Sequence, residues 1–366
     1  MLRPIVLTIA GLAGSIGAVP AVAAERESVA GIELLGEVRL PTGQRVEGTE
    51  MGGLSGLAYD ADADRFLAVS DDRGDRDDAR FYELSLDLAD GDLVDGDVDF
   101  TGVTTLRDAD GQPYAQGTID PEGIALAGDG SVLVSSEGDA GDLVAPFVNR
   151  YTRDGGLAAE LPVPEDYVPS AGGDSGIRDN LAFESLTLTP SGRHLVTGTE
   201  NALVQDGEAA TLEAGSRSRI LAYDARREQP AAEYVYETDP VPDAPEPADG
   251  HADNGLVELL ALDGTTFLAL ERAYAQGVGN DVRIFEVSAR PQDRIRPGRD
   301  VTDTPAVSKT LVANIEDDFG VSPDNVEGMA LGPVLPDGRQ SLVLVSDNNF
   351  STSQVTQFLA FAVDLG

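Results

Sequence analysis

The chain has 366 residues, and its 65 acidic residues against 25 lysines and arginines give a formal net charge of −40 at pH 7. This balance excludes nucleic acid and anionic membrane surfaces as partners, because both are bound by clustered Lys and Arg, whereas Lys309 is the one lysine. The absence of cysteine and the presence of only two histidines, His194 and His251, exclude disulfides, thiolate zinc sites and multi-histidine metal centres. Oxygen ligands remain abundant, and they suit a hard cation such as Ca²⁺.

Residues 1–24 have the pattern of a secretory signal peptide. Arg3 supplies the positive start, residues 5–19 form an apolar run, and Ala21-Val22-Ala23 fits a small-residue cleavage site. A short membrane anchor is the alternative, but the run is shorter than the roughly 20 apolar residues that span a bilayer. We therefore expect a secreted or periplasmic protein in which residues 25–366 form a single domain without a membrane span.

A loose internal repeat runs through the rest of the chain, and such a repeat decides the architecture. Each unit begins with a short apolar strand and continues through a turn into a second apolar run that ends in an acid. The first strands are Leu54-Ser55-Gly56-Leu57-Ala58, Pro121-Glu122-Gly123-Ile124-Ala125, Phe183-Glu184-Ser185-Leu186-Thr187, Val257-Glu258-Leu259-Leu260-Ala261 and Val326-Glu327-Gly328-Met329-Ala330. The second runs end at Ser70-Asp71, Ser136-Glu137, Thr199-Glu200, Leu270-Glu271 and Ser346-Asp347.

Further strand-like runs complete each unit. Third runs lie at residues 80–84, 148–151, 219–223, 282–285 and 358–363, and fourth runs lie around Val98 and at residues 157–163, 232–236 and 308–312. The last unit lacks a fourth run, which residues 32–40 can supply from the N-terminal side.

Four strands per unit and a strand that closes the last unit predict an all-β fold, a β-propeller with five countable repeats. A sixth blade is possible in the longer spacers at residues 164–179 or 239–254. The competing architecture is an irregular β-sandwich, which the strand-level repetition disfavours. We expect the protein to be a monomer.

The repeated acids suggest a metal-binding channel, because the first strand of each propeller blade lines the central channel. Equivalent first strands would place Glu122, Glu184, Glu258 and Glu327 around one axis, with Ser55 at the fifth position. The acids that end the second strands, Asp71, Glu137, Glu271 and Asp347 together with Glu200, form a parallel set. A shared Ca²⁺ would relieve their mutual repulsion. The alternative is that these acids end strands and stay solvated.

Basic residues are scarce, so their positions are informative. Arg73 and Arg80 flank an acidic loop, Arg178 precedes Asn180, and Arg272 follows Glu271. An Arg beside a Ca²⁺ cluster can hold a phosphate or carboxylate through two hydrogen bonds. We therefore expect Arg73, Arg80 and Asn180 to bind an anionic substrate, although each Arg can instead neutralise a neighbouring acid. His194 lies in a predicted strand and His251 in a Pro/Asp-rich loop, and neither has a convincing catalytic partner in the sequence.

Several motifs in these segments resemble the phytase-like family, which is named for an esterase-like activity of phytase. The motifs are Asp71-Asp72-Arg73-Gly74 with Ala79-Arg80-Phe81-Tyr82, Asp120-Pro121-Glu122-Gly123-Ile124-Ala125, Arg178-Asp179-Asn180-Leu181-Ala182-Phe183-Glu184-Ser185-Leu186, Leu270-Glu271-Arg272 and Val345-Ser346-Asp347-Asn348-Asn349-Phe350. True β-propeller phytases are six-bladed, Ca²⁺-dependent enzymes that hydrolyse phosphate esters, so the resemblance implies a propeller and a related hydrolytic chemistry.

Two functions from different classes remain open at this stage. The first is a secreted or periplasmic Ca²⁺-dependent hydrolase of small phosphate or carboxylate esters, in which Glu122 or Glu184 is the general base and Arg178 or Arg272 holds the anionic group. The second is a non-catalytic propeller that binds a ligand or a cell-envelope partner and whose calcium is structural. Both fit the same fold, so the site must discriminate between them.

Overall fold

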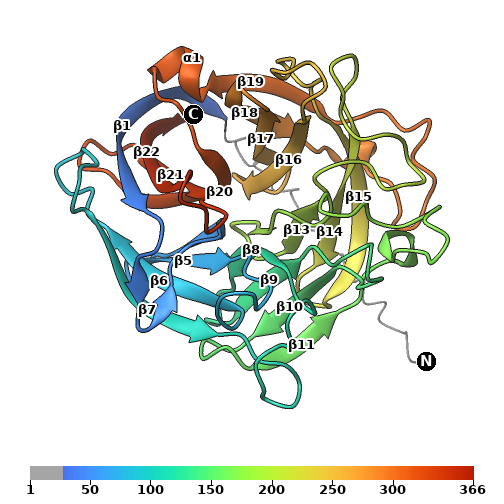
Figure 1. The fold of residues 1–366 in the computed structure, drawn as a ribbon, viewed down its shortest axis with the longest axis horizontal. Helices are drawn as coiled ribbons and strands as arrows, with labels where there is room; N and C mark the ends of the chain where they lie inside the picture. Colours follow the sequence, from blue (N-terminus) through green and yellow to red (C-terminus); the bar gives the residue numbers. More distant parts are fainter. Residues whose placement is uncertain (1–27) are drawn as a thin grey trace, which may run out of the picture.

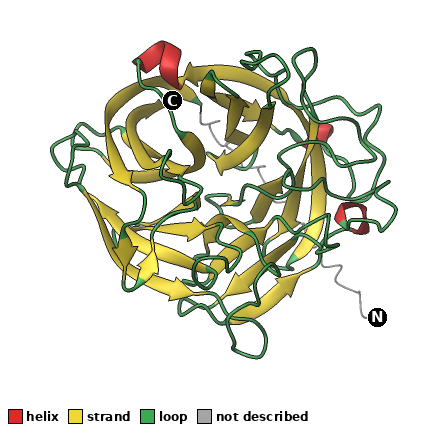
Figure 2. Cartoon of the chain, in the orientation of Figure 1, coloured by secondary structure: helices red, strands yellow, loops and turns green. Residues whose placement is uncertain are grey.

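The computed structural model describes residues 28–366, which form five four-stranded antiparallel sheets and one two-stranded hairpin. Figure 1 shows these sheets arranged around a central axis, and Figure 2 shows that the described chain contains very little helix. The fold is therefore a five-bladed β-propeller, as the internal repeat predicted. The predicted signal peptide at residues 1–24 lies outside the described residues.

In the first four blades the strands follow chain order from the channel outward. These blades comprise β4 (Leu54–Asp60), β5 (Arg65–Ser70), β6 (Arg80–Leu86) and β7 (Val98–Thr105); β8 (Pro121–Leu126), β9 (Val132–Ser136), β10 (Phe147–Tyr151) and β11 (Leu157–Leu161); β12 (Thr187–Leu188), β13 (His194–Gly198), β14 (Arg217–Asp224) and β15 (Gln229–Glu237); and β16 (Ala252–Ala261), β17 (Thr266–Ala275), β18 (Gly279–Ser288) and β19 (Ser308–Asn314).

The fifth blade combines the two ends of the described chain. Its inner strands are β20 (Asn325–Val334), β21 (Gln340–Asp347) and β22 (Val355–Leu365), and its outer strand is β1 (Val29–Pro41). Within the β1–β22 ladder, Ile32 pairs with Val363 and Val38 pairs with Phe358. The prediction that residues 32–40 close the ring is confirmed, and β1 covers the outer edge of β22.

The remaining elements lie between blades or at the ring's surface. They are the hairpin strands β2 (Arg45–Val46) and β3 (Thr49–Glu50), the short helix α1 (Ile315–Phe319), and the single 3₁₀ turns η1 (Glu165–Tyr167) and η2 (Pro291–Asp293). Residues 164–179 therefore contain one 3₁₀ turn, and residues 239–254 form a loop that leads into β16. Neither spacer holds a sixth blade, because a loop that makes few ladder hydrogen bonds cannot form a four-stranded sheet.

The apolar core lies between adjacent blades, which explains why the second and third strands read as continuous apolar runs. Along β21, Leu342 and Leu344 pack in the cluster shared with the fourth blade. Val343 and Val345 pack in the cluster shared with the first blade. Since successive side chains alternate between the two faces, both faces are buried and the inner strands are held firmly around the channel.

Candidate functional site

A β-bulge at the same place in every blade shapes the channel wall. Between the innermost strand and the second strand, the inner strand carries one extra residue. The pairs that flank it are Leu54 with Ser70 and Gly56 with Val69 in the first blade, Pro121 with Ser136 and Ile124 with Val134 in the second, Phe183 with Thr199 and Thr187 with Val196 in the third, Leu256 with Glu271 and Glu258 with Leu270 in the fourth, and Val326 with Ser346 and Gly328 with Val345 in the fifth. A bulge redirects the side chain of its extra residue, so these ladders define which residues are equivalent.

The bulge overturns the sequence alignment of the fourth blade. Glu327 is the extra residue of the fifth blade, but the extra residue of the fourth is Val257 rather than Glu258. For the same reason Arg272, and not Glu271, is equivalent to the acids that end the other second strands. The predicted ring of four equivalent glutamates is therefore wrong at Glu258, and the predicted second-strand set is wrong at Glu271.

Glu258 occupies the position that Gly56, Gly123 and Gly328 hold in three other blades. These glycines pack closely, since a Cβ on Gly56 would lie 2.6 Å from the carbonyl oxygen of Glu122. The Glu258 carboxylate accepts the N–H of Leu259 at 2.8 Å and those of Leu186 and Met329 in the neighbouring blades. Burial raises the pKa of Glu258 well above its usual range. This carboxyl group links three blades through backbone amides, apart from the other channel acids.

Glu271 is directed away from the channel into a dense set of donors. Its carboxylate accepts from the Tyr236 hydroxyl at 2.7 Å, from the Asp239 N–H at 2.9 Å and from the Asn254 amide at 2.9 Å. Lys309 forms an ion pair with the same carboxylate. These partners satisfy Glu271 fully, so its role is to fix the fourth blade rather than to bind a metal ion.

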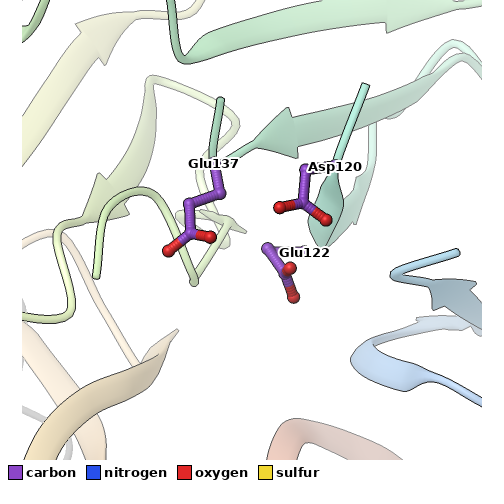
Figure 3. A group of neighbouring side chains, drawn as sticks. All are labelled: Asp120, Glu122 and Glu137. Carbon is purple, nitrogen blue, oxygen red and sulfur yellow. The ribbon is translucent and has the colours of Figure 1, made fainter. Parts of the chain in front are cut away.

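A compact group of acids lies on the channel side of the second blade. Oxygens of Asp120, Glu122 and Glu137 lie within 4.8 Å of one another, and Figure 3 shows the three carboxyl groups facing a common space. A second group, Glu137, Glu184 and Glu200, meets the same distance limit and shares Glu137 with the first. All of these side chains are buried. The structure thus brings the predicted residues Glu122, Glu137 and Glu184 together with Glu200, and it adds Asp120.

Burial and mutual repulsion oppose ionisation of these acids. They raise the pKa values of Glu122, Glu137 and Glu184 well above the ordinary range. Burial raises the pKa of Asp120 to about 6 and that of Glu200 to about 7, in each case despite a nearby Arg. Ionising the whole group of acids therefore has a large electrostatic cost unless a cation offsets the negative charge.

The predicted acids of the first and fifth blades lie beside this group. Burial, followed by repulsion from Asp347 and Asp120, raises the pKa of Asp71 well above its usual value. Burial also raises the pKa values of Glu327 and Asp347 to about 8. The Asn325 amide donates to both of these carboxylates, at 2.9 Å to Glu327 and 3.3 Å to Asp347. The channel acids therefore form one continuous cluster of carboxyl groups across several blades, the acidic surface of the channel.

Two buried oxygens show that the donors present in the protein do not satisfy this surface. Asp71 Oδ1 and Asp120 Oδ1 are buried and accept no hydrogen bond. A buried carboxylate oxygen without a donor is costly, and carboxylates are the ligands that Ca²⁺ prefers. The residues present therefore fit a hard divalent cation held by Asp120, Glu122 and Glu137, with Glu184 and Glu200 beside them.

Two arginines stand among the acids. Arg73 lies 2.5 Å from Asp120 and 3.7 Å from Glu137, and it donates to Asn180 Oδ1 at 2.9 Å. Its side chain is 34% exposed, so it covers the acid group while still reaching solvent. Arg73 and Asn180, both predicted to bind substrate, therefore lie at the mouth of the channel.

Arg272 reaches the channel acids from β17 of the fourth blade. Its guanidinium is 3.3 Å from Glu327, 3.6 Å from Glu200 and 3.7 Å from Asp253. Its Nε is buried and donates no hydrogen bond. An unused donor on a buried guanidinium is suited to an anionic group that enters from the cleft beside it.

That cleft has a volume of about 620 Å³, and polar side chains dominate its walls. Its lining residues are Asn180, His251, Asp253, Arg272, Tyr274, Asn280, Asp324, Asn325, Glu327, Asn349, Ser353 and Gln354. The cleft joins the channel acids through Glu327 and Arg272, so a small ligand in it would contact both the acids and the arginine.

Two predicted arginines lie elsewhere. Arg80 is fully buried, where it donates to Asp72 at 2.7 Å and to the Tyr82 hydroxyl at 2.6 Å, so it has no access to a ligand and the substrate-binding prediction for it is wrong. Arg178 donates to the backbone carbonyls of Ala202 and Gly207 and does not line the cleft. Arg178 therefore holds a loop, and it lies apart from the cleft that Arg272 lines.

Sequence reasoning missed Asp120, Asp253 and Asn325 as site residues. Asp120 and Asn325 lie at the start of the inner strand, before the bulge, and the equivalent place in the first blade is occupied by Gly53. The available signal was the polar residue that precedes the repeated apolar strand in some blades. The face on which the Asp253 side chain lies follows from the alternation of side chains along a strand, but only when β16 is known to begin at Ala252.

The part of the chain that the structure describes contains no helix with the length and hydropathy needed to cross a membrane. An uncharacterized secreted protein of Arthroderma benhamiae is 25% identical over 142 residues, which cover 32% of this chain and 26% of that protein. The match thus spans about a quarter of that relative's length.

Two solved structures match this chain over most of its length at low sequence identity. An endo-arabinase from Bacteroides thetaiotaomicron has a TM-score of 0.45 at 11% identity, covering 89% of this chain and 97% of that one. A periplasmic gluconolactonase from Pseudomonas aeruginosa has a TM-score of 0.37 at 12% identity, covering 90% of this chain and 99% of that one.

The sequence profile of one family matches most of the chain. The family is described as phytase-like, esterase-like activity of phytase, and the match extends over residues 49–350. These residues include the inner strands of all five blades and the acids and arginines of the channel. The chain belongs to the phytase-like family.

Proposed function

We propose that this protein is a Ca²⁺-dependent hydrolase of small anionic esters, phosphate or carboxylate, that acts at the mouth of the channel. The observation that carries the proposal is the excess of buried acid over base next to an open cleft. Asp120, Glu122, Glu137, Glu184 and Glu200 lie together, and Arg73 and Arg272 are the arginines that contact them. Membership of the phytase-like family is consistent with ester hydrolysis.

A cation is needed to offset the charge. Two unit charges about 4 Å apart repel by roughly 4 kcal/mol at an effective dielectric constant of 20. Several such pairs occur here, because the oxygens in each triad lie within 4.8 Å of one another. Protonation can relieve the repulsion at low pH, whereas a divalent cation relieves it at neutral pH. The unpartnered Oδ1 of Asp120 supports the second solution.

The residues divide the work of ester hydrolysis. Bound Ca²⁺ would supply charge neutralisation and polarisation of the ester oxygen. Arg272, which lines the cleft, would hold the anionic part of the substrate, and Arg73 with Asn180 would contact the same part at the mouth of the channel. A carboxylate of Glu122 or Glu184 would accept the proton of the attacking water.

One observation favours the alternative, a binding module with a structural calcium. The side chains of Asp120 and Glu137 are 4% and 1% exposed, and Arg73 covers them. An ion enclosed in this way would fasten the second and third blades together without reaching a substrate. Arg272 and its free Nε favour the enzyme, because no structural partner uses that donor.

A hydrolysis screen with and without Ca²⁺ tests the proposal. Purified protein would be assayed with phosphomonoesters, phosphodiesters, carboxylic esters and lactones, each in millimolar Ca²⁺ and in chelator at fixed ionic strength. We expect hydrolysis of an anionic ester that chelator abolishes and Ca²⁺ restores. Folded, Ca²⁺-loaded protein that hydrolyses none of these compounds would refute the enzyme and leave the binding module.

The cellular location is part of the same proposal. The N-terminal pattern with Arg3, the apolar residues 5–19 and the Ala21-Val22-Ala23 site supports export to the periplasm or the medium. The partially matching relative is described as secreted. N-terminal sequencing of the exported protein would show cleavage near residue 24, and an intact N-terminus in the cell pellet would argue against export.

A further inference from the structure

The fourth blade presents a histidine–carboxylate pair to the same cleft. His251 Nε2 lies 2.6 Å from Asp253 Oδ2. His251 has no evident partner in the sequence pattern, but β16 begins at Ala252, so His251 and Asp253 are two residues apart on extended chain and their side chains share one face. Both residues line the cleft that Arg272 also lines.

Strand pairing places this pair and the arginine on one face of the blade. In the β16–β17 ladder, Asp253 lies opposite Tyr274 and Gly255 lies opposite Arg272. Residues that lie opposite each other point to the same side of a sheet. Gly255 leaves the room that Glu200 needs to approach Arg272, since a Cβ there would lie 2.2 Å from Glu200 Oε1. The face therefore carries a basic group for an anion and a histidine beside it.

Backbone and ring contacts hold His251 in place. The backbone N–H of His251 donates to Gln276 Oε1 at 3.2 Å, and the backbone carbonyl of His251 accepts the backbone N–H of Gln276 at 2.9 Å. The imidazole lies 6.3 Å from the Tyr274 ring between centroids. Nε2 is engaged by Asp253, which leaves Nδ1 as the ring nitrogen that can exchange a proton with a ligand.

We infer that His251, oriented by Asp253, protonates the leaving group of the ester held on Arg272. This inference rests on the proposed function. In the step, the oxygen of water bonds to the phosphorus or carbonyl carbon, and the bond to the leaving-group oxygen breaks. The proton of the water passes to a channel glutamate, and the Nδ1 proton of the imidazolium passes to the leaving oxygen. Exchange with solvent then restores both groups.

Charged groups face His251 from several elements of the cleft. Asp253 is its direct partner, and Asp324 and Glu327 line the same cleft. Arg272 is the opposing cation, and its Nη1 contacts Asp253 Oδ1 at 3.7 Å. The Asp253 carboxylate therefore contacts the imidazole through Oδ2 and the guanidinium through Oδ1, and it sets the separation of the two side chains. No other histidine lines this cleft.

The test uses the dependence of rate on the leaving group. A general acid contributes about 100-fold or more when the leaving oxygen is basic and little when it is a good leaving group. His251→Gln should therefore reduce kcat by about 100-fold on phenyl phosphate or on the anionic carboxylic ester phenyl hydrogen succinate, and by no more than about threefold on the p-nitrophenyl analogue of each. The alkaline side of the wild-type pH profile on the phenyl ester should flatten in this variant.

Two further variants sharpen the comparison. His194→Gln is the matched control, because His194 lies in β13 and lines a different pocket, and it should leave both rates unchanged. Asp253→Asn should reproduce the loss on the phenyl ester in kcat while KM changes little. Because the chain has only two histidines, ¹⁵N-histidine spectra of untagged protein can follow the ring directly. The Nε2 signal of His251 should shift in Asp253→Asn.

The outcomes separate this inference from the proposed function. Active wild type in which His251→Gln slows both leaving groups equally, or neither, overturns the inference and leaves the hydrolase intact. Folded, Ca²⁺-loaded wild type that hydrolyses none of the compounds in the hydrolysis screen overturns both. An unchanged Nε2 signal in Asp253→Asn would show that the pair does not form in solution, which also overturns the inference.

Discussion

Replacement of Glu258 by alanine tests the register that the bulge imposes on the fourth blade. The sequence alignment makes Glu258 one of four equivalent channel acids, whereas the structure makes it an acceptor for backbone amides of three blades. If the structure is correct, Glu258→Ala should destabilise the fold and leave the Ca²⁺ response intact. If the alignment is correct, the variant should lose the Ca²⁺ response.

The magnitude follows from the contacts. The variant leaves the N–H groups of Leu259, Leu186 and Met329 without their carboxylate acceptor. Each orphaned buried donor costs at least about 1 kcal/mol, so the loss is about 3 kcal/mol in the free energy of unfolding. At about 2.1 cal/mol/K per residue, the described residues 28–366 have an unfolding entropy of about 0.7 kcal/mol/K. The expected fall in Tm is therefore about 4 °C.

Thermal melts in Ca²⁺ and in chelator, at fixed ionic strength, provide the assay. A cation at a hundredfold excess over its Kd adds about 2.7 kcal/mol, which corresponds to a rise of about 4 °C by the same conversion. Wild type and Glu258→Ala should show the same rise. Glu137→Gln is the comparison variant, and it should abolish the rise because Glu137 belongs to both acid triads. A Glu258→Ala protein that melts like wild type, or that loses the Ca²⁺ response, would refute this reasoning.

Other perturbations have equally specific outcomes. In chelator, the free energy of unfolding should be greatest below about pH 4.5 and should fall as the pH rises to 8. Burial raises the pKa of Glu200 to about 7 and that of Glu327 to about 8, so the folded state binds more protons than the unfolded state over this range. Urea unfolding from pH 5 to 8 measures the fall, and a flat profile would contradict it. Arg272→Gln should lower kcat/KM by about 10- to 150-fold while the Ca²⁺-dependent melt survives. Arg178→Gln is its control and should keep kcat/KM within about twofold, and equal losses in both variants would count against Arg272 as the anion-binding residue. Deletion of β1 (Val29–Pro41) should leave the fifth blade open and prevent folding; a monomeric, cooperatively melting product in size-exclusion and circular-dichroism measurements would show that closure is dispensable.

The architecture was largely readable from the sequence. Repeated pairs of apolar runs separated by turns, together with the unpaired run at residues 32–40, predicted the blades and their closure. This succeeds because strand formation and turn formation depend on local residue patterns. The number of blades needed the structure, since the long spacers at residues 164–179 and 239–254 carry polar sequence that is compatible with either loops or short strands.

The site was readable only in part. Glu122, Glu137 and Glu184 were chosen correctly as neighbours, because in their blades the alignment of apolar runs agrees with the ladder register. Arg80 was misplaced, because a scarce basic residue beside acids can bind a ligand or pair with its neighbours, and only the burial of its side chain decides between these roles. His251 lacked a partner until β16 brought Asp253 to the same face.

The sequence by itself determined that the chain is acidic, all-β and repetitive, that its last blade is completed from the N-terminal side, and that acids recur at the inner strands. Only the tertiary structure decided which member of each neighbouring pair faces the channel. In the fourth blade Val257 takes the place expected for Glu258, and Arg272 takes the place expected for Glu271. The physical reason is that side chains alternate along a strand, so a shift of one residue exchanges the two faces. The position of a bulge is set by hydrogen bonds between strands, which a single run of residues does not record.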